Sequence, residues 1–164
     1  MKKLSFVVLT MVLLCGCSQP KTFETMSDVY YEPEAEKAGT ITFSIPADAA
    51  VTVMENAEHG VLYLCDEYCI VQQILPSGDL DATVRSVTGY PKKNVKIMQR
   101  EVGESILYSC VWASAGENGD QVGKAVILDD GGYHYVLSVM ADADIAGKLA
   151  DQWRNILDTF SIVP

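Results

Sequence analysis

Residues 145–160 of the chain read IAGKLADQWRNILDTF, and their apolar side chains recur at helical spacing. Polar side chains fill the opposite face, and Asp142 or Asp144 can cap the first turn. One apolar face and one polar face are typical of a helix that covers the core of a domain. The sequence therefore predicts a helix packed on a sheet. Its apolar face contains Ile145, Leu149, Trp153, Ile156, Leu157 and Phe160.

The stretches before this helix predict the sheet. Short runs of alternating apolar and polar residues, separated by turn residues, indicate strands joined by hairpins. The Asp-Asp-Gly-Gly sequence at 129–132 supplies residues that tolerate positive φ, as a tight hairpin requires. We expect an antiparallel sheet from the runs 40–45, 51–54, 61–64, 68–75, 95–98, 105–113, 122–128 and 133–140.

A second, shorter helix is predicted between the fourth and fifth of these runs. Leu80, Val84 and Val87 recur at helical spacing after Ser77-Gly78-Asp79. Gly89-Tyr90-Pro91 then supplies a typical helix end. The two helices and the sheet together predict an α+β domain.

Three features of the chain resemble the PsbP/Mog1-like proteins. They are the opening ITFSIP at 41–46, the run of hairpins, and the closing WRNILDTFSI at 153–162. The resemblance covers residues 39–163 and implies a central antiparallel sheet with helices packed on its faces. It also implies a binding or assembly protein without catalysis, and no functional residue of the family maps onto a position of this chain.

The N-terminus has the layout of an export signal. Lys2 and Lys3 precede an apolar run over residues 4–14, which is shorter than the roughly 20 residues that a membrane span needs. The next residues offer no A-x-A-like cleavage site. Leu14-Cys15-Gly16-Cys17 resembles the lipobox of bacterial lipoprotein precursors. The resemblance implies that residues 1–16 are a signal peptide and that Cys17 becomes a lipidated N-terminus.

Residues 17–38 are expected to connect the lipid to the domain as a flexible tether, because they mix acids with two prolines and show no apolar period. Residues 39–164 are then a single α+β domain. The lipid on Cys17 would hold this domain on the extracytoplasmic side of the cell membrane.

The charge of the chain excludes one class of partner. The formal net charge is −10, and loss of Lys2 and Lys3 with the signal peptide lowers it by two. Such a surface repels a phosphate backbone, so we expect no nucleic-acid partner. It also disfavours docking on anionic lipid through basic patches, so the lipid on Cys17 must provide the membrane attachment.

Three of the five cysteines remain in the predicted domain. With a three-residue loop, Cys65 and Cys69 would face each other across a hairpin, close enough for a disulfide. With a two-residue loop, Cys65 would face Tyr68 instead. A bridge from one of them to Cys110, or three thiols, are the alternatives. In each case we expect a structural role, since the C-x-x-C spacing of redox sites is absent.

Catalytic motifs are missing from the sequence. No G-x-S-x-G is present, and the two histidines are His59 and His134. His134 is expected on the polar, outward face of its strand. We expect no cofactor, no metal and no catalytic residue. Two alternatives remain open: a hydrolase-type enzyme built from scattered acids and His134, and a thiol or metal module around Cys65 and Cys69.

The favoured hypothesis is a lipid-anchored, extracytoplasmic and non-catalytic binding or accessory module of the cell envelope. Its partner would be an envelope protein or ligand that meets one face or edge of the sheet. A flat exposed aromatic patch, with Tyr63 or Tyr90, would favour this hypothesis. A deep pocket that gathers His134 with two carboxylates would favour the enzyme.

Overall fold

The computed structural model describes residues 23–26, 38–53, 60–116 and 119–163. The predicted signal peptide, Cys17, His59 and most of the predicted tether lie outside the described residues. The strands are β1 (Phe23–Met26), β2 (Thr40–Pro46), β3 (Ala50–Val53), β4 (Gly60–Leu64), β5 (Cys69–Pro76), β6 (Lys96–Val102), β7 (Ser105–Gly116), β8 (Gly119–Asp129), β9 (Tyr133–Asp142) and β10 (Ser161–Val163). The helices are α1 (Leu80–Thr88), α2 (Ala143–Ala146) and α3 (Ala150–Asp158), with 3₁₀ turns η2 (Lys92–Asn94) and η3 (Gly147–Leu149).

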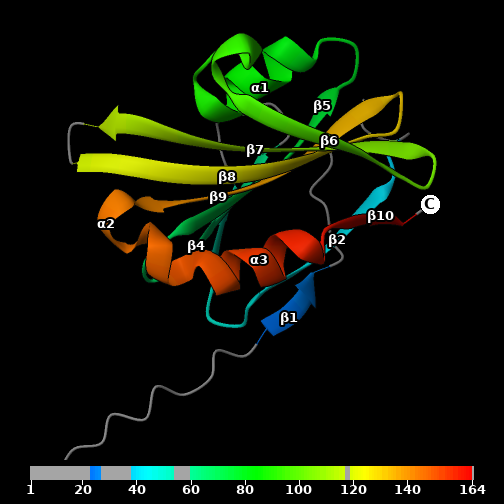
Figure 1. The fold of residues 1–164 in the computed structure, drawn as a ribbon. Coiled ribbons are helices and arrows are strands. Elements are labelled where there is room, and N and C mark those ends of the chain that lie inside the picture. Colours follow the sequence, from blue (N-terminus) through cyan, green and yellow to red (C-terminus); the bar gives the residue numbers. More distant parts are fainter. Residues whose placement is uncertain (1–22, 27–37, 54–59, 117–118, 164) are drawn as a thin grey trace, which may run out of the picture.

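The main sheet contains seven strands in the order β3-β4-β5-β9-β8-β7-β6, and neighbouring strands are antiparallel. A smaller sheet contains β1, β2 and β10. Figure 1 shows α1 on one side of the main sheet, with α2 and α3 on the other side. The predicted α+β architecture, an antiparallel sheet with helices on its faces, is therefore the one observed.

Helix α1 begins and ends where its sequence predicts. The Asp79 side chain accepts hydrogen bonds from the N–H groups of Asp81 and Ala82, which caps the first turn. Gly89, with φ of 77°, ends the helix in the left-handed conformation that glycine adopts without strain. Val84 is fully buried and packs with Ile127 and Val136 of the sheet.

The long C-terminal helix is divided into α2, η3 and α3. Asp142 occupies the cap position, but its side chain makes no capping hydrogen bond. Gly147 stands at the start of the 3₁₀ turn, where glycine weakens an α-helix. The predicted apolar face is nevertheless continuous across the break. Leu149, Trp153, Ile156, Leu157 and Phe160 are buried against the main core, and Ile145 packs at its margin.

Strand β2 closes the main core from the side of α3. Ile41, Phe43 and Ile45 are 1–3% exposed, and the Phe43 ring meets Tyr63 edge-on at 5.6 Å between ring centroids. β2 pairs with β10 on one side and with β1 on the other. Residues 23–26 lie within the predicted tether, and their pairing with β2 is not expected from the sequence.

The start of the domain is tied to the β8–β9 hairpin. The Tyr135 hydroxyl accepts a hydrogen bond from the Gly39 N–H at 2.8 Å and donates one to Asp130 Oδ2 at 2.8 Å. Burial, together with the neighbouring Asp130 carboxylate, raises the pKa of Tyr135 to about 12. The hydroxyl therefore keeps its proton and remains a donor to Asp130.

Candidate binding site on the bare face of the sheet

Three neighbouring strands of the main sheet extend beyond the cover of α3. Strand register places nine side chains of β6, β7 and β8 on the face that α3 partly covers. Two of them, Met98 and Val111, are 61% and 54% exposed although apolar. In rows across the strands, the nine are Lys96–Val111–Lys124, Met98–Ser109–Val126 and Arg100–Leu107–Leu128.

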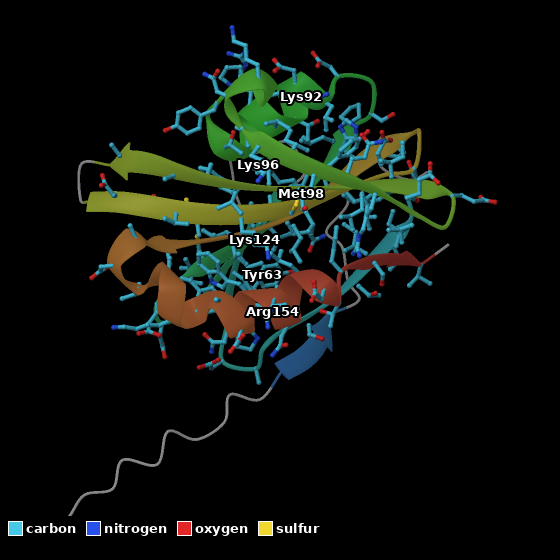
Figure 2. The ribbon with its side chains drawn as sticks, viewed as in Figure 1. Tyr63, Lys92, Lys96, Met98, Lys124 and Arg154 are labelled. Carbon is cyan, nitrogen blue, oxygen red and sulfur yellow. The ribbon has the colours of Figure 1, made fainter. Side chains whose placement is uncertain are left out.

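A groove runs over this bare face. It consists of two hollows of about 390 and 220 Å³, which share Met98, Ser109 and Lys124. The larger hollow is bounded on one side by Leu157 and Asp158 of α3. Figure 2 shows Lys96 and Met98 on β6 and Lys124 on β8, on the part of the sheet drawn above α3. The groove therefore has an apolar floor with cationic side chains around it.

Charge is distributed unevenly around the groove. Lys96, Arg100 and Lys124 line it, and Asp158 is the single carboxylate among its lining residues. Within the described part of the chain, none of these three cations forms an ion pair, whereas Arg85 pairs with Asp81 and Arg154 with Asp151. On a chain with a net charge of −10, this groove is a local site that attracts anions.

The aromatic patch proposed from the sequence is not the exposed apolar surface. Tyr63 is 1% exposed, and its hydroxyl donates to Gln72 Oε1 at 3.2 Å, while burial raises its pKa. Tyr90 is half-buried and packs against the cluster of Cys110, Trp112 and Ala125. The sequence signal that was missed is the alternation of Lys96, Met98 and Arg100, which marks one face of an edge strand.

His134 is buried, so its predicted place on an outward polar face is wrong. It is 1% exposed because α1 covers that face of the sheet. Its Nδ1 lies 2.7 Å from Thr83 Oγ1, and its Nε2 lies 3.5 Å from Asp129 Oδ2. The described residues thus give His134 one carboxylate neighbour and almost no contact with solvent. This arrangement fastens α1 to the sheet and does not form the pocket that the hydrolase alternative requires.

The β4–β5 hairpin has the two-residue loop. Leu64 pairs with Cys69, and the Cys65 N–H donates to the Tyr68 carbonyl at 3.0 Å. Adjacent residues of a strand point to opposite faces, so this register sets Cys65 against Tyr68 and not against Cys69. A Cys65–Cys69 disulfide would need the other register, and it stays a prediction.

Cys65, Cys69 and Cys110 are thiols in the structure. Burial raises the pKa of Cys69, and it raises that of Cys110 to about 11. A raised pKa leaves little thiolate at neutral pH, which makes both thiols poor nucleophiles. Across residues 23–26, 38–53, 60–116 and 119–163, no three His, Cys, Asp or Glu side chains converge as they would around a metal ion.

Within the same described ranges, no helix is long and apolar enough to cross a membrane. Cys17 and the predicted signal peptide lie outside these ranges, so the structure does not test their lipidation or cleavage.

No protein-family model matches the sequence, and no curated protein matches it. Solved structures do match. CyanoP, the PsbP of the cyanobacterium Synechocystis, is 14% identical with a TM-score of 0.61, covering 91% of this chain and 97% of that one. The Ran-binding protein Mog1p of Saccharomyces cerevisiae is 11% identical with a TM-score of 0.55, covering 88% and 97%.

LpqN of Mycobacterium tuberculosis, which is involved in cell envelope biogenesis, is 16% identical with a TM-score of 0.51, covering 87% of this chain and 92% of that one. These likenesses extend over most of each chain. They confirm the predicted PsbP/Mog1-like fold.

Proposed function

We propose that this protein is a non-catalytic binding module of the cell envelope that recognises its partner through the bare face of β6–β8. Lipid on Cys17 would hold it on the extracytoplasmic side of the cell membrane. The observation that carries the proposal is the exposed pair Met98 and Val111, surrounded by Lys96, Arg100 and Lys124.

Physical chemistry supports recognition at this face. Covering the apolar floor with a partner removes apolar surface from water and so stabilises the complex. The surrounding cations favour a partner of opposite charge and speed its association. Within the described residues, the cations have no intramolecular ion pair to break when a partner arrives. The likeness to LpqN, itself involved in cell envelope biogenesis, fits an envelope location.

Site-specific crosslinking in intact cells tests the proposal. A photo-reactive residue replaces Val111 in the full chain, and a second version carries it at Leu64, which is 47% exposed on the other face of the sheet. We expect a discrete crosslinked product from position 111 and none from position 64. Mass spectrometry then identifies the captured protein.

A pair of charge variants provides the matched control. Lys96→Glu with Lys124→Glu should abolish the crosslink from position 111. Lys93→Glu with Lys148→Glu changes the net charge equally at two exposed sites away from the groove, and should leave the crosslink intact. Equal loss in both double variants, or equal crosslinking from positions 111 and 64, would place recognition elsewhere.

A further inference from the structure

Strand β6 is an open edge of the main sheet. Among residues 23–26, 38–53, 60–116 and 119–163, it ends the strand order and pairs with β7 alone. Six of its seven residues are exposed, and Ile97 is half-buried. An edge strand of this length presents unpaired backbone donors and acceptors to any extended segment that can lie beside it.

The β6–β7 turn fixes which backbone groups are unpaired. Val102 and Ser105 close a two-residue turn. The closing pair of such a hairpin exchanges hydrogen bonds, and bonded and non-bonded pairs alternate along the strands from there. The N–H and C=O groups that point away from β7 therefore belong to Ile97, Gln99 and Glu101.

The side chains of β6 on the groove face add a chemical pattern to this edge. Lys96, Met98 and Arg100 occupy every second position, so the face reads cation, apolar, cation. A strand added beside β6 would set its own alternate side chains directly opposite these three. The best complement is acidic, apolar, acidic at positions i, i+2 and i+4.

Building on the proposed function, we propose that the partner contributes an extended acidic segment that joins the main sheet as an eighth strand beside β6. Its apolar residue packs on Met98 at the mouth of the groove. Its two acidic side chains pair with Lys96 and Arg100, while Lys124 adds positive charge deeper in the groove. Backbone hydrogen bonds to the outward-pointing groups of Ile97, Gln99 and Glu101 provide the affinity.

Charge distinguishes this occupant from a second copy of the chain. The groove-facing side of β6 carries Lys96, Met98, Arg100 and Val102, with no acidic residue. Pairing of β6 with the same strand of another copy would therefore bring cations together and neutralise none of them. An acidic segment from a different protein would neutralise these cations and avoid their mutual repulsion.

A peptide-binding experiment on the exported full chain tests the proposal. The probe is a fluorescent peptide of sequence Thr-Glu-Thr-Val-Thr-Glu-Thr, and fluorescence anisotropy reports its dissociation constant. A peptide of the same composition with the two acids on opposite faces of the strand is the control. We expect the alternating peptide to bind at least about fivefold more tightly, and its affinity to fall as salt is raised.

Gln99→Pro isolates the backbone contribution. Proline removes the outward-pointing N–H of this residue and leaves the hydrogen bonds between β6 and β7 in place. We expect about tenfold weaker binding, which corresponds to about 1.4 kcal/mol. Gln99→Ala keeps the N–H and should bind within about twofold of the unmodified protein. Circular dichroism verifies that both variants fold.

A reciprocal test leaves the protein unchanged, so it is decisive even if Gln99→Pro fails to fold. Methylation of the peptide's backbone nitrogens that face β6 should weaken binding about tenfold, and methylation of those that face away should not. Equal binding by all of these peptides would overturn strand addition.

The outcomes separate this inference from the proposed function. If crosslinking from position 111 persists in the Gln99→Pro variant, recognition through the β6–β8 face is supported and strand addition beside β6 is contradicted. Sedimentation could instead show that the peptide-free protein is a dimer and that the Gln99→Pro variant is a monomer. That result would assign the edge of β6 to a second copy of the chain. Absence of both the crosslink and peptide binding would overturn both proposals.

Discussion

Asp130 illustrates how a single turn residue contributes to the fold. Its carboxylate accepts hydrogen bonds from the N–H groups of Gly132 and Tyr133 at 2.9 and 2.8 Å, and from the Tyr135 hydroxyl. Partial burial on its own would raise the pKa of Asp130. The three hydrogen bonds to the charged form outweigh it and hold the pKa below its ordinary value.

We predict that Asp130→Asn lowers the free energy of unfolding by about 1–2 kcal/mol at pH 7. A lowered folded-state pKa means that the carboxylate stabilises the fold above its unfolded pKa of about 3.9 and loses this effect as pH falls through the folded value. Urea unfolding between pH 7 and pH 2.5 should therefore show the difference between variant and unmodified protein shrinking below about pH 4. A difference that stays constant over this range would assign another role to Asp130.

The buried contact between Thr83 and His134 allows a second prediction at this scale. Thr83→Val removes the hydroxyl that lies 2.7 Å from His134 Nδ1 and leaves a buried ring nitrogen without its neighbour. We expect a loss of about 1–3 kcal/mol of unfolding free energy in chemical denaturation. Thr83→Ser should restore most of it. Crosslinking from position 111 should be unchanged in both variants, because the contact lies under α1 on the other face of the sheet.

Among the elements, α3 contributes a large apolar anchor to the main core. Trp153 is 5% exposed within the main core, and its Nε1 has no hydrogen-bond partner among the described residues. We predict that Trp153→Ala lowers the free energy of unfolding by about 3–5 kcal/mol. Trp153→Phe keeps an aromatic ring and removes the unsatisfied donor, so thermal unfolding should show a much smaller loss. Equal losses in the two variants would contradict this assignment.

Elements with local signals were predictable from the sequence, and those that depend on distant partners were not. The α1 boundaries follow from Asp79 and Gly89, and the apolar face of α3 follows from spacing alone. The strand order requires β5 to pair with β9, and the paired residues are 57 to 71 positions apart, which no local pattern specifies. Strand β1 forms because β2 has a free edge, and its own four residues show no alternation that reveals this.

The candidate site was hidden from the sequence for a related reason. Met98 and Val111 are exposed only because α3 ends short of β6 and β7, a property of packing between segments far apart in the chain. His134 was misplaced because strand alternation gives its face, but not the presence of α1 over that face. Local pattern thus identifies the faces of a strand, and tertiary packing decides which of them solvent reaches.

For the whole molecule, the predicted attachment through Cys17 has a direct test. Cys17→Ser prevents lipidation, and the apolar run before it is too short to span a membrane stably. We expect the variant to leave the membrane fraction as an uncleaved or soluble form, and to lose incorporation of labelled palmitate. Normal processing with full membrane retention would contradict the lipobox prediction.

The proposed recognition face lies on consecutive strands, and this has a consequence for how the protein can diversify. Along β6 and β7, one set of alternate positions contacts α1 and the other set faces the groove. Leu107, on the groove side, also belongs to the main core. Apart from this residue, selection, natural or in the laboratory, can therefore randomise the groove-facing set within one contiguous gene segment while the residues that hold the domain together stay fixed. The β6–β7 hairpin therefore offers variable surface positions on an unchanged scaffold. Libraries of variants randomised at positions 96, 98, 100, 109 and 111 should yield folded proteins with new binding specificities.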